Sequence, residues 1–555
     1  MEVKMEMKKN RYEIRLVSSL EKVFSDARPV YRPECIKLSG LKGETISFQA
    51  ACSSVDSERS RVKVQVESAL KDQIRIRQVE NVPVWKASGK NVDDNYLKTD
   101  AGLYPDLLRE MENDETYIYP EKWKSLWIDI DITEEVPAGV YPVKIRLKKG
   151  QEKLAEAETA VTIYNAVLPK QKIIHTEWFY ADCLADYYHV PVFSEEHWKI
   201  MENYIREYVK RGGNMILTPL FTPALDTAVG HERTTTQLLD IEVKSGEYHF
   251  GFEKLKRWVD LCRSCGIQYF EMSHLFSQWG AAYAPKVVAL KDGKEEKIFG
   301  WHTPASGKYT DFLHVLLPQL TGKLKEWGIA EVTWFHLSDE PREEDLDSYR
   351  AARESIEDLL DGFHTMDALS DYKFYEHGLV EQPVPANDAI QEFLNHGVEN
   401  LWTYYCVSQS YEVSNRFMAM PSLRNRIYGL QLYKYRIAGI LHWGYNFYNS
   451  QYSLEKLNPY QVTDAGGCFA AGDPFLVYPG TDGYPEESIR MMVLEEALQD
   501  LRACELLESL AGRETVMECI EENLAEPLTF TCFPKTDYYL IALRNRINRE
   551  IAKRI

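Results

Sequence analysis

The segment from Glu331 to Pro341, EVTWFHLSDEP, contains residues whose types and spacing are well suited to chemistry. It begins with the apolar, β-branched and aromatic residues that are typical of a buried strand. It ends in two adjacent carboxylic acids, Asp339 and Glu340. Because burying a charge without a partner is costly, acids in this position indicate a functional site. They could also form the acidic first turn of a following helix, and this segment alone leaves both interpretations open.

The two acids can act together only if the strand is interrupted where they lie. Neighbouring residues of a regular strand point to opposite faces, which would separate the two carboxyl groups. Pro341 disfavours helical angles at Glu340 and predicts an extended or polyproline conformation there. We therefore expect a break that brings Asp339 and Glu340 to one cavity.

The elements that would position these acids alternate between strand and helix from residue 169 to residue 507. Eight segments have the composition of buried strands, and amphipathic helical patterns separate most of them. The segments are residues 173–182, 214–221, 269–276, 331–340, 364–369, 378–384, 400–407 and 437–447. The sixth has the weakest strand pattern. This alternation predicts an α/β fold, a (β/α)8 TIM-like barrel with enlarged loops.

The two ends of the chain have different patterns. Residues 1–168 contain about seven short alternating strands separated by turn signals, which predicts an N-terminal all-β sandwich domain. Within them, residues 91–115 break the alternation and are expected to form a long loop that reaches elsewhere. Residues 508–555 predict a C-terminal helical extension. Its basic, amphipathic end would close the barrel or form a contact in a homo-oligomer.

The active site of such a barrel lies at the carboxyl ends of its strands, so polar and aromatic residues at these ends are candidates for substrate binding. They are Trp178, Asp182, Asp226, His274, Trp279, Asp367, Tyr404, Trp443 and Asn446. Carboxylates, one histidine, and a ring of tryptophan and tyrosine suit a neutral, polyhydroxylated ligand. Each residue also has a structural interpretation: the aromatic residues as core packing, the histidine as a satisfied core residue, the aspartates as caps of helices or turns.

Charge and composition exclude several kinds of partner. The 555 residues carry a net charge of −20 and show no basic stripe, so we expect no nucleic-acid partner. No stretch approaches the roughly 20 apolar residues of a membrane span, and the N-terminus lacks the apolar region of a signal peptide. The ten cysteines form no framework, which favours a cytoplasmic protein with reduced thiols.

No cofactor signature is present in the sequence. The chain contains no GxSxG, GxxxxGK[ST] or HExxH motif. The single CxxC, Cys262 and Cys265, lies in a helical pattern and is interpreted as a pair of buried thiols. We therefore expect neither a metal nor an organic cofactor.

Several segments resemble glycoside hydrolase family 123: FYADCLADYY, ILTPLFTPALDT, FEMSHLFSQWGA, FHLSDEP, LWTYYC, LHWGYNFY and, in the N-terminal domain, WIDIDITEEVPAGVYPVKIRL. The likeness covers most of the chain. It implies a β-N-acetylgalactosaminidase in which the 2-acetamido group of the substrate is the nucleophile, an exception to the two-carboxylate rule of glycosidases. Glu340 would be the acid and base, and Asp339 would hold the acetamido N–H. Adjacent carboxylates fit these roles, because neither needs to lie across the sugar from the other.

The same residues are compatible with two other functions. A retaining glycosidase with its own nucleophile would need a carboxylate, such as Asp226 or Asp367, roughly 5–5.5 Å from Glu340. A catalytically inactive carbohydrate-binding protein could have the same fold, because fold does not imply function.

Overall fold

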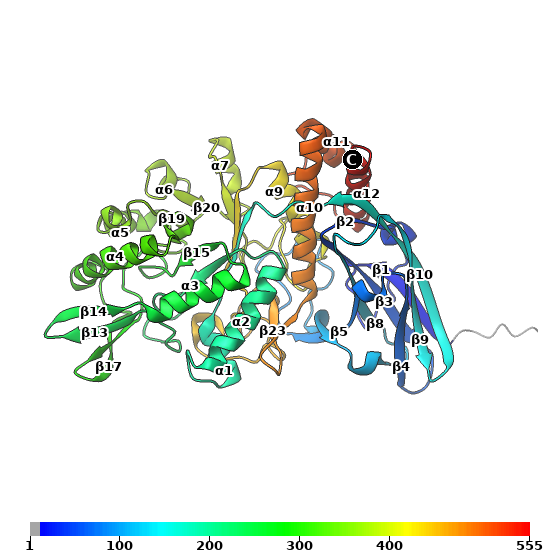
Figure 1. Cartoon of the computed structure of the whole chain (residues 1–555), viewed down its shortest axis with the longest axis horizontal. Coiled ribbons are helices and arrows are strands. Elements are labelled where there is room, and N and C mark those ends of the chain that lie inside the picture. The colour runs from blue at the N-terminus through cyan, green and yellow to red at the C-terminus, as the bar shows by residue number, and fades with distance from the viewer. Residues whose placement is uncertain (1–10) are drawn as a thin grey trace, which may run out of the picture.

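Two five-stranded sheets form the N-terminal part of the computed structural model, which describes residues 11–555 (Figure 1). The first ten residues of the expected N-terminal domain lie outside the described residues. In order across the first sheet the strands are β1 (Tyr12–Ser18), β3 (Glu44–Ser54), β8 (Lys124–Ile132), β5 (Ile74–Val84) and β6 (Gly102–Glu110). Across the second they are β2 (Leu38–Lys42), β10 (Glu152–Val167), β9 (Gly139–Lys149), β4 (Ser60–Glu67) and β7 (Glu115–Ile118).

Alternating apolar residues hold the two sheets together. Val143, Ile145 and Leu147 of β9 are fully buried and share one core with Phe48 of β3 and Ile128 of β8. Every second residue of a strand points to the same face, so the residues between them face away from this core. The predicted β-rich N-terminal domain is confirmed, and its two sheets share one core.

The prediction of a loop at residues 91–115 is wrong in its second part, because Gly102–Glu110 forms β6 and β7 begins at Glu115. The first part does reach the barrel. Asp93 pairs with Arg424 at 2.8 Å, and the Tyr96 hydroxyl donates to the Ser410 carbonyl at 2.7 Å. Pro105 and the polar residues of this segment obscured β6, which is held by its antiparallel pairing with β5.

Eight parallel strands form a nearly closed barrel after the sandwich. In chain order they are β11 (Ile174–Glu177), β12 (Met215–Thr218), β15 (Tyr269–Met272), β18 (Thr333–Phe335), β19 (His364–Ala368), β20 (Gln382–Val384), β21 (Trp402–Tyr404) and β22 (Gly439–His442). Between β20 and β21, Tyr404 N–H donates to the Pro385 carbonyl at 3.1 Å and Asn387 N–H to the Tyr404 carbonyl at 2.9 Å. Each of the eight predicted segments contains one of these strands, and all are shorter than expected.

Helices follow every strand of the barrel. They are α1 (Ala181–Tyr188), α2 (Glu195–Lys210), α3 (Glu253–Cys265), α4 (Lys308–Glu326), α5 (Leu346–Glu354), α6 (Lys373–Glu376), α7 (Ile390–Asn395), α8 (Leu423–Arg426), α9 (Tyr428–Lys434) and α10 (Ile489–Ala511). In α2, the Ser194 hydroxyl caps the N-terminus by accepting from His197 N–H. Gly266 ends α3 in a left-handed conformation with φ of 108°.

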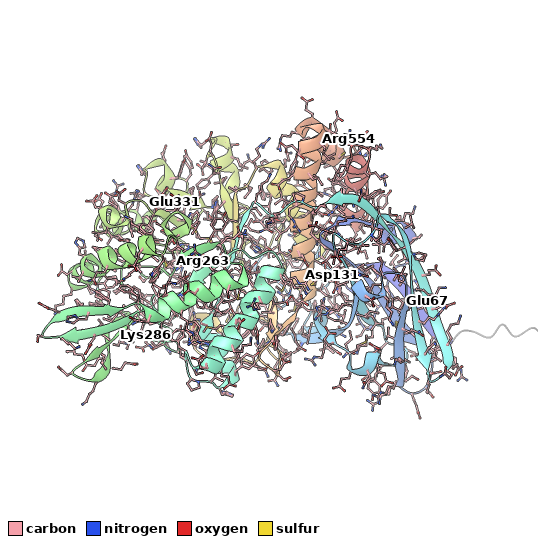
Figure 2. The ribbon with its side chains drawn as sticks, in the orientation of Figure 1. Glu67, Asp131, Arg263, Lys286, Glu331 and Arg554 are labelled. Atoms are coloured by element: carbon pink, nitrogen blue, oxygen red, sulfur yellow. The ribbon has the colours of Figure 1, made fainter. Side chains whose placement is uncertain are left out.

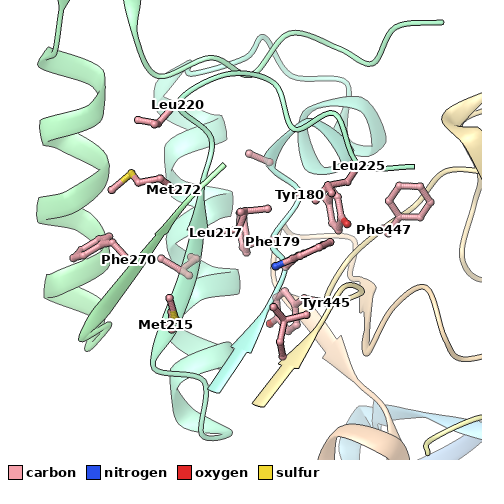
Figure 3. Packing of buried hydrophobic residues seen from close by; sticks show 14 of the residues in the cluster. Phe179, Tyr180, Met215, Leu217, Leu220, Leu225, Phe270, Met272, Tyr445 and Phe447 are labelled. Carbon is pink, nitrogen blue, oxygen red and sulfur yellow. The ribbon is translucent and has the colours of Figure 1, made fainter. Parts of the chain in front are cut away.

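Alternation within the barrel strands separates an apolar side from a polar interior. Met215 and Leu217 of β12 pack in one cluster with Phe270 and Met272 of β15 (Figure 3). Glu271 lies between the last two along the chain and points to the opposite face, where it is fully buried. The alternation of side chains along β15 therefore places the carboxyl group of Glu271 inside the barrel.

A small four-stranded sheet extends from the barrel loops, and the sequence pattern did not predict it (Figure 1). Its strands are β14 (Glu247–Gly251), β13 (Asp240–Lys244), β16 (Val287–Lys291) and β17 (Lys294–Phe299). A hairpin of β23 (Val477–Pro479) and β24 (Pro485–Glu487) precedes α10. Charged residues such as Glu67, Arg263 and Glu331 cover the outer surface (Figure 2).

The C-terminal helices pack against the sandwich. The expected domain boundary at residues 507 and 508 falls within α10, which continues to Ala511 and is followed by α11 (Arg513–Glu521) and α12 (Asp537–Ala552). In α12, Arg544 pairs with Glu44 of β3, and Asn548 donates to the Ser39 hydroxyl of β2 at 3.1 Å. Within residues 11–555, no helix has both the length and the hydropathy to cross a membrane.

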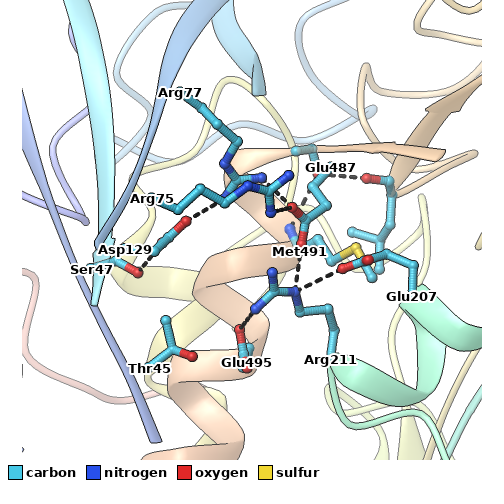
Figure 4. A network of polar contacts seen from close by, with 12 residues as sticks. Thr45, Ser47, Arg75, Arg77, Asp129, Glu207, Arg211, Glu487, Met491 and Glu495 are labelled. Atoms are coloured by element: carbon cyan, nitrogen blue, oxygen red, sulfur yellow. Dashed lines mark hydrogen bonds and ion pairs between the residues drawn. The ribbon is translucent and has the colours of Figure 1, made fainter. Parts of the chain in front are cut away.

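Buried ion pairs join the sandwich to the barrel (Figure 4). Glu487, at the end of β24, accepts from Arg77 of the sandwich and from Arg211 after α2. Arg77 also pairs with Asp129, and Arg211 with Glu495 at 2.8 Å. Burial alone would raise the pKa of Glu487, but the two guanidinium groups lower it well below its usual value. The carboxylate is therefore charged and links both parts.

We expect Glu487→Gln to lower the free energy of unfolding by about 3–5 kcal/mol, because it leaves buried guanidinium groups without their partner. Denaturant unfolding followed by circular dichroism measures this change. Glu195→Gln is the matched control, since Glu195 pairs with Arg257 on the exposed surface and its loss should change stability little. Equal small losses in both variants would contradict the role given to Glu487.

Candidate active site

An open cavity of about 760 Å³ lies at the carboxyl ends of the barrel strands. Most of the residues predicted from the sequence line it: Trp178, Asp226, Trp279, Asp339, Glu340, Tyr404 and Trp443. They come from the ends of six different strands or from the loops that follow them. The structure thus brings residues that are far apart in the chain to one place.

The two acids face this cavity together, each with its own donor. Asp339 is 5% exposed, and its Oδ2 accepts from the Gln278 side-chain amide at 2.7 Å. Glu340 is less buried, and its Oε1 accepts from the Tyr404 hydroxyl at 2.6 Å. The expected break in the strand is present, since β18 ends at Phe335.

The conformation expected for Glu340 is wrong. Its φ is +44°, in the left-handed region, and not extended. The backbone is held on both sides, because Glu340 N–H donates to the Ala368 carbonyl at 2.9 Å and the Asp339 carbonyl accepts from Trp279 N–H at 3.0 Å. Non-glycine residues with positive φ are uncommon and often occur at functional sites.

Burial makes Asp339 difficult to ionise. Desolvation is the main cause, and the neighbouring charge of Glu340 is the next; together they raise the pKa of Asp339 well above its usual value. Adjacent carboxyl groups in a confined space titrate as a pair. The pair therefore retains a proton at a pH at which an isolated aspartate would be ionised.

Gln278 is a further residue of the site, in the loop after β15, and its partner was not predicted. Its Oε1 accepts from Asp226 N–H at 2.7 Å, so its amide nitrogen must be the group that donates to Asp339. Its neighbour Trp279 was predicted from the same loop, but nothing in the loop sequence indicates that the glutamine faces an acid on another strand. Gln278 fixes one oxygen of Asp339 and leaves the other free.

Aromatic side chains form the walls and the rim of the cavity. Trp443 lines the wall and donates its indole N–H to Asp473 at 2.9 Å. At the rim, Trp279 is 40% exposed and Tyr452 is 39% exposed, with ring centroids 6.3 Å apart. Asp226 holds Tyr452 by accepting from its backbone N–H at 3.1 Å, and burial raises the pKa of Asp226 to about 6. Aromatic faces of this kind suit the apolar faces of sugars.

Asp182 and Asn446 do not line the cavity, which corrects their prediction as direct substrate ligands. Asp182 lies in the first turn of α1 and pairs with buried Arg233 through two hydrogen bonds of 2.8 and 2.6 Å. Asn446 bonds the backbone of Tyr180, accepting from its N–H at 2.9 Å and donating to its carbonyl at 3.0 Å. Their polar atoms are used to fix the loops behind the wall.

His274 and Asp367 also lie behind the wall, which corrects their prediction in the same way. His274 is fully enclosed and stacks on His336, with ring centroids 4.2 Å apart. Asp367 accepts from the backbone N–H groups of Leu337 at 3.1 Å and Ser338 at 3.2 Å. Neither side chain is available to a sugar in the cavity.

These two residues belong to a buried network around His336. Its Nδ1 lies 3.1 Å from Asp367, and its Nε2 faces Glu271, which also accepts from the Trp178 indole N–H. The potential ligand atoms of His274, His336 and Asp367 lie within 4.8 Å of one another. However, both nitrogens of His336 face carboxylates, and the lone pairs of two stacked imidazoles do not converge on one point. The arrangement fits an ion-pair network better than a metal site.

The family model for the glycoside hydrolase 123 catalytic domain matches residues 178–507. The chain belongs to glycoside hydrolase family 123. It is therefore a glycoside hydrolase with a carbohydrate substrate. The matched segment contains the acid pair, its two donors and the aromatic wall.

One solved structure supports the fold assignment. A family 123 glycoside hydrolase from Clostridium perfringens, described in a study of glycolipid glycan hydrolysis, has a TM-score of 0.73 at 18% identity, covering 98% of both chains. More distant are a putative β-galactosidase from Bacteroides fragilis (10% identity, TM-score 0.33, covering 86% of this chain and 60% of that one) and a GH2 β-galacturonidase from Eisenbergiella tayi (12%, 0.33, 88% and 73%). No curated protein matched the sequence.

We expect Tyr404→Phe to lower kcat of this family 123 enzyme by about 10- to 100-fold, because it removes the hydrogen bond that holds the Glu340 carboxyl group in the cavity. Steady-state hydrolysis of an aryl glycoside measures the change. Tyr405→Phe is the matched control, since Tyr405 is the buried neighbour that packs against His442 outside the cavity. The same loss of kcat in both variants would contradict a specific role for Tyr404.

Proposed function

We propose that the enzyme removes a terminal β-linked N-acetylhexosamine, and specifically N-acetylgalactosamine, by a retaining, substrate-assisted mechanism on a (β/α)8 barrel. The observation that carries this proposal is the geometry of Asp339 and Glu340. They are adjacent in the chain and face one cavity with separate donors. An acid and a protein nucleophile would have to approach the sugar from different sides, whereas an acid and an orienting carboxylate need not.

Each residue then has one role. Asp339 accepts the acetamido N–H through the oxygen that Gln278 leaves free, which directs the acetamido oxygen toward C1. That oxygen forms a bond to C1 while Glu340 protonates the departing glycosidic oxygen, giving an oxazolinium intermediate. Glu340 then takes a proton from the water that attacks C1 and reopens the ring. The two inversions at C1 give net retention.

The cavity restricts the alternative mechanism. A protein nucleophile must be a carboxylate that reaches the sugar, and Asp367 is excluded because it lies behind the wall, bonded to Leu337 and Ser338. Asp226 is the other acid that lines the cavity, and it holds the backbone of Tyr452. The proposal therefore assigns Asp226 to the rim and not to the covalent step.

A panel of aryl β-glycosides with and without the acetamido group tests the function. We expect turnover of the N-acetylgalactosaminide, none of the plain galactoside or glucoside, and inhibition by a thiazoline analogue of the intermediate. Turnover of plain glycosides that is lost in Asp226→Asn would instead support a protein nucleophile. Ligand protection against unfolding without turnover of any glycoside would indicate an inactive binding protein.

Asp339→Asn and Glu340→Gln separate the two roles. We expect Asp339→Asn to lower kcat by roughly 10²- to 10³-fold on all acetamido substrates, because the charge-stabilising acceptor is lost. Glu340→Gln should affect substrates with poor leaving groups more strongly, because good leaving groups depart without protonation. Asp260→Asn, on the exposed face of α3, is the control. A fully active Asp339→Asn enzyme would refute the assignment.

A further inference from the structure

Exposed residues mark the mouth of the catalytic cavity. Of the described residues that line it, Trp279, Ser408 and Tyr452 are the exposed ones, and two of these are aromatic. The deeper lining is closed, and Trp178 there is only 2% exposed. The rest of a glycan whose terminal sugar occupies the cavity must therefore leave through this mouth.

The acid pair lies between the closed interior and the mouth. Glu340 is partly exposed, whereas its neighbour Asp339 is 5% exposed. Trp279 is next to the pair in space, because its N–H donates to the Asp339 carbonyl at 3.0 Å. The glycosidic bond that Glu340 protonates lies beside its carboxyl group, so the sugar on the outer side of that bond reaches the rim of the cavity.

We propose that Trp279 and Tyr452 form the binding site for the leaving-group sugar, so that the enzyme acts preferentially on an N-acetylhexosamine linked to a second pyranose. The inference rests on the proposed function, in which Glu340 protonates the departing glycosidic oxygen. A pyranose ring has an apolar face of C–H groups and an edge of hydroxyl groups. Tryptophan and tyrosine match both, because each has an apolar ring and one polar group.

The two rings form a corner that suits a single pyranose. Their centroids are 6.3 Å apart and their planes are inclined by 83°. One ring can therefore cover the apolar face of a sugar while the other meets its edge. Within residues 11–555, neither the Trp279 indole N–H nor the Tyr452 hydroxyl has a hydrogen-bond partner, so both are available to sugar hydroxyl groups.

The backbone holds both rings in place before a sugar binds. The φ angle is +56° at Trp279 and +59° at Tyr452, which is uncommon for bulky residues and persists only where neighbouring groups enforce it. Tyr452 is bonded on both sides: its N–H donates to Asp226 Oδ2 at 3.1 Å, and its carbonyl accepts from Ala228 N–H at 3.0 Å. A site held in this way loses little conformational entropy on binding.

The same contacts connect the rim to the acid pair. Asp226 holds the Tyr452 backbone through its carboxyl group, and its own N–H donates to Gln278 Oε1 at 2.7 Å. The amide nitrogen of Gln278 donates in turn to Asp339 at 2.7 Å. Asp226 is therefore a positioning residue, which fixes the place of the Tyr452 ring relative to the catalytic carboxyl groups.

Two substrates that share β-linked N-acetylgalactosamine and differ in the second ring test the site: its methyl glycoside and its disaccharide with galactose. An aryl glycoside is unsuitable, because its own ring can stack on the rim. We expect Trp279→Ala and Tyr452→Ala each to lower the ratio of kcat/KM for the disaccharide to that for the methyl glycoside by about 10-fold. Comparing ratios removes the different reactivities of the two leaving groups. Tyr538→Ala is the control, an exposed tyrosine of α12 whose loss should leave the ratio unchanged.

Two variants of Asp226 test its positioning role. Asp226→Asn keeps an oxygen that can accept the Tyr452 N–H, so the ratio should stay close to that of the wild-type enzyme. Asp226→Ala removes the acceptor and should lower the ratio as Tyr452→Ala does. An equal loss of kcat/KM on both substrates in Trp279→Ala and Tyr452→Ala would overturn the proposal, because the rings would then support the cavity without binding the second sugar.

A measurement of binding separates this proposal from the proposed function. In Glu340→Gln enzyme, the disaccharide should raise the melting temperature more than N-acetylgalactosamine alone, and Trp279→Ala in the same enzyme should abolish the difference. Equal protection by the two sugars would overturn the binding site. A wild-type enzyme that hydrolyses neither substrate would contradict the proposed function, whereas greater protection by the disaccharide would still support the site at the rim.

Discussion

The adjacency of Asp339 and Glu340 is the constraint on which the rest of the site depends. Two neighbouring carboxylates repel one another, and burial adds a desolvation cost to the charge of each. Such a pair can face one cavity only if each acid has its own donor and the backbone is held in place. Gln278 and Tyr404 are those donors, and they come from different strand ends. The left-handed turn at Glu340 is held by hydrogen bonds to the end of β19 and to the loop after β15.

The barrel and the sandwich supply these restraints jointly. Parallel strands bring β15, β18 and β19 side by side, so loops that are distant in sequence meet at one end. The sandwich supports another wall of the cavity: Tyr96 bonds Ser410, close to the lining residues Val407 and Ser408. Buried arginine and glutamate pairs hold the two parts together. The N-terminal domain is therefore part of the catalytic unit and not a separate attachment.

The sequence predicted what depends on local pattern and missed what depends on tertiary contacts. Each barrel strand is a short apolar run, so all eight could be located, but strand length is set by hydrogen bonds to neighbours, and β18 covers only Thr333–Phe335. Residues at strand ends were the correct place to look for the cavity. The contacts of Gln278 and His336 were not predicted, because they are made with carboxyl groups that follow or lie on other strands.

In the proposed mechanism, recognition of the substrate and activation of the acid are one event. Burial and repulsion leave a proton shared within the pair when the cavity is empty. An acetamido N–H that donates to Asp339 favours the ionised form of that carboxyl, because hydrogen bonds to a charged form stabilise it. The shared proton then belongs on Glu340, where the leaving group requires it. A sugar without the acetamido group would provide neither the nucleophile nor the hydrogen bond that places the shared proton on Glu340. The adjacency of the two acids therefore makes both the attack on C1 and the protonation of the leaving group selective for acetamido sugars.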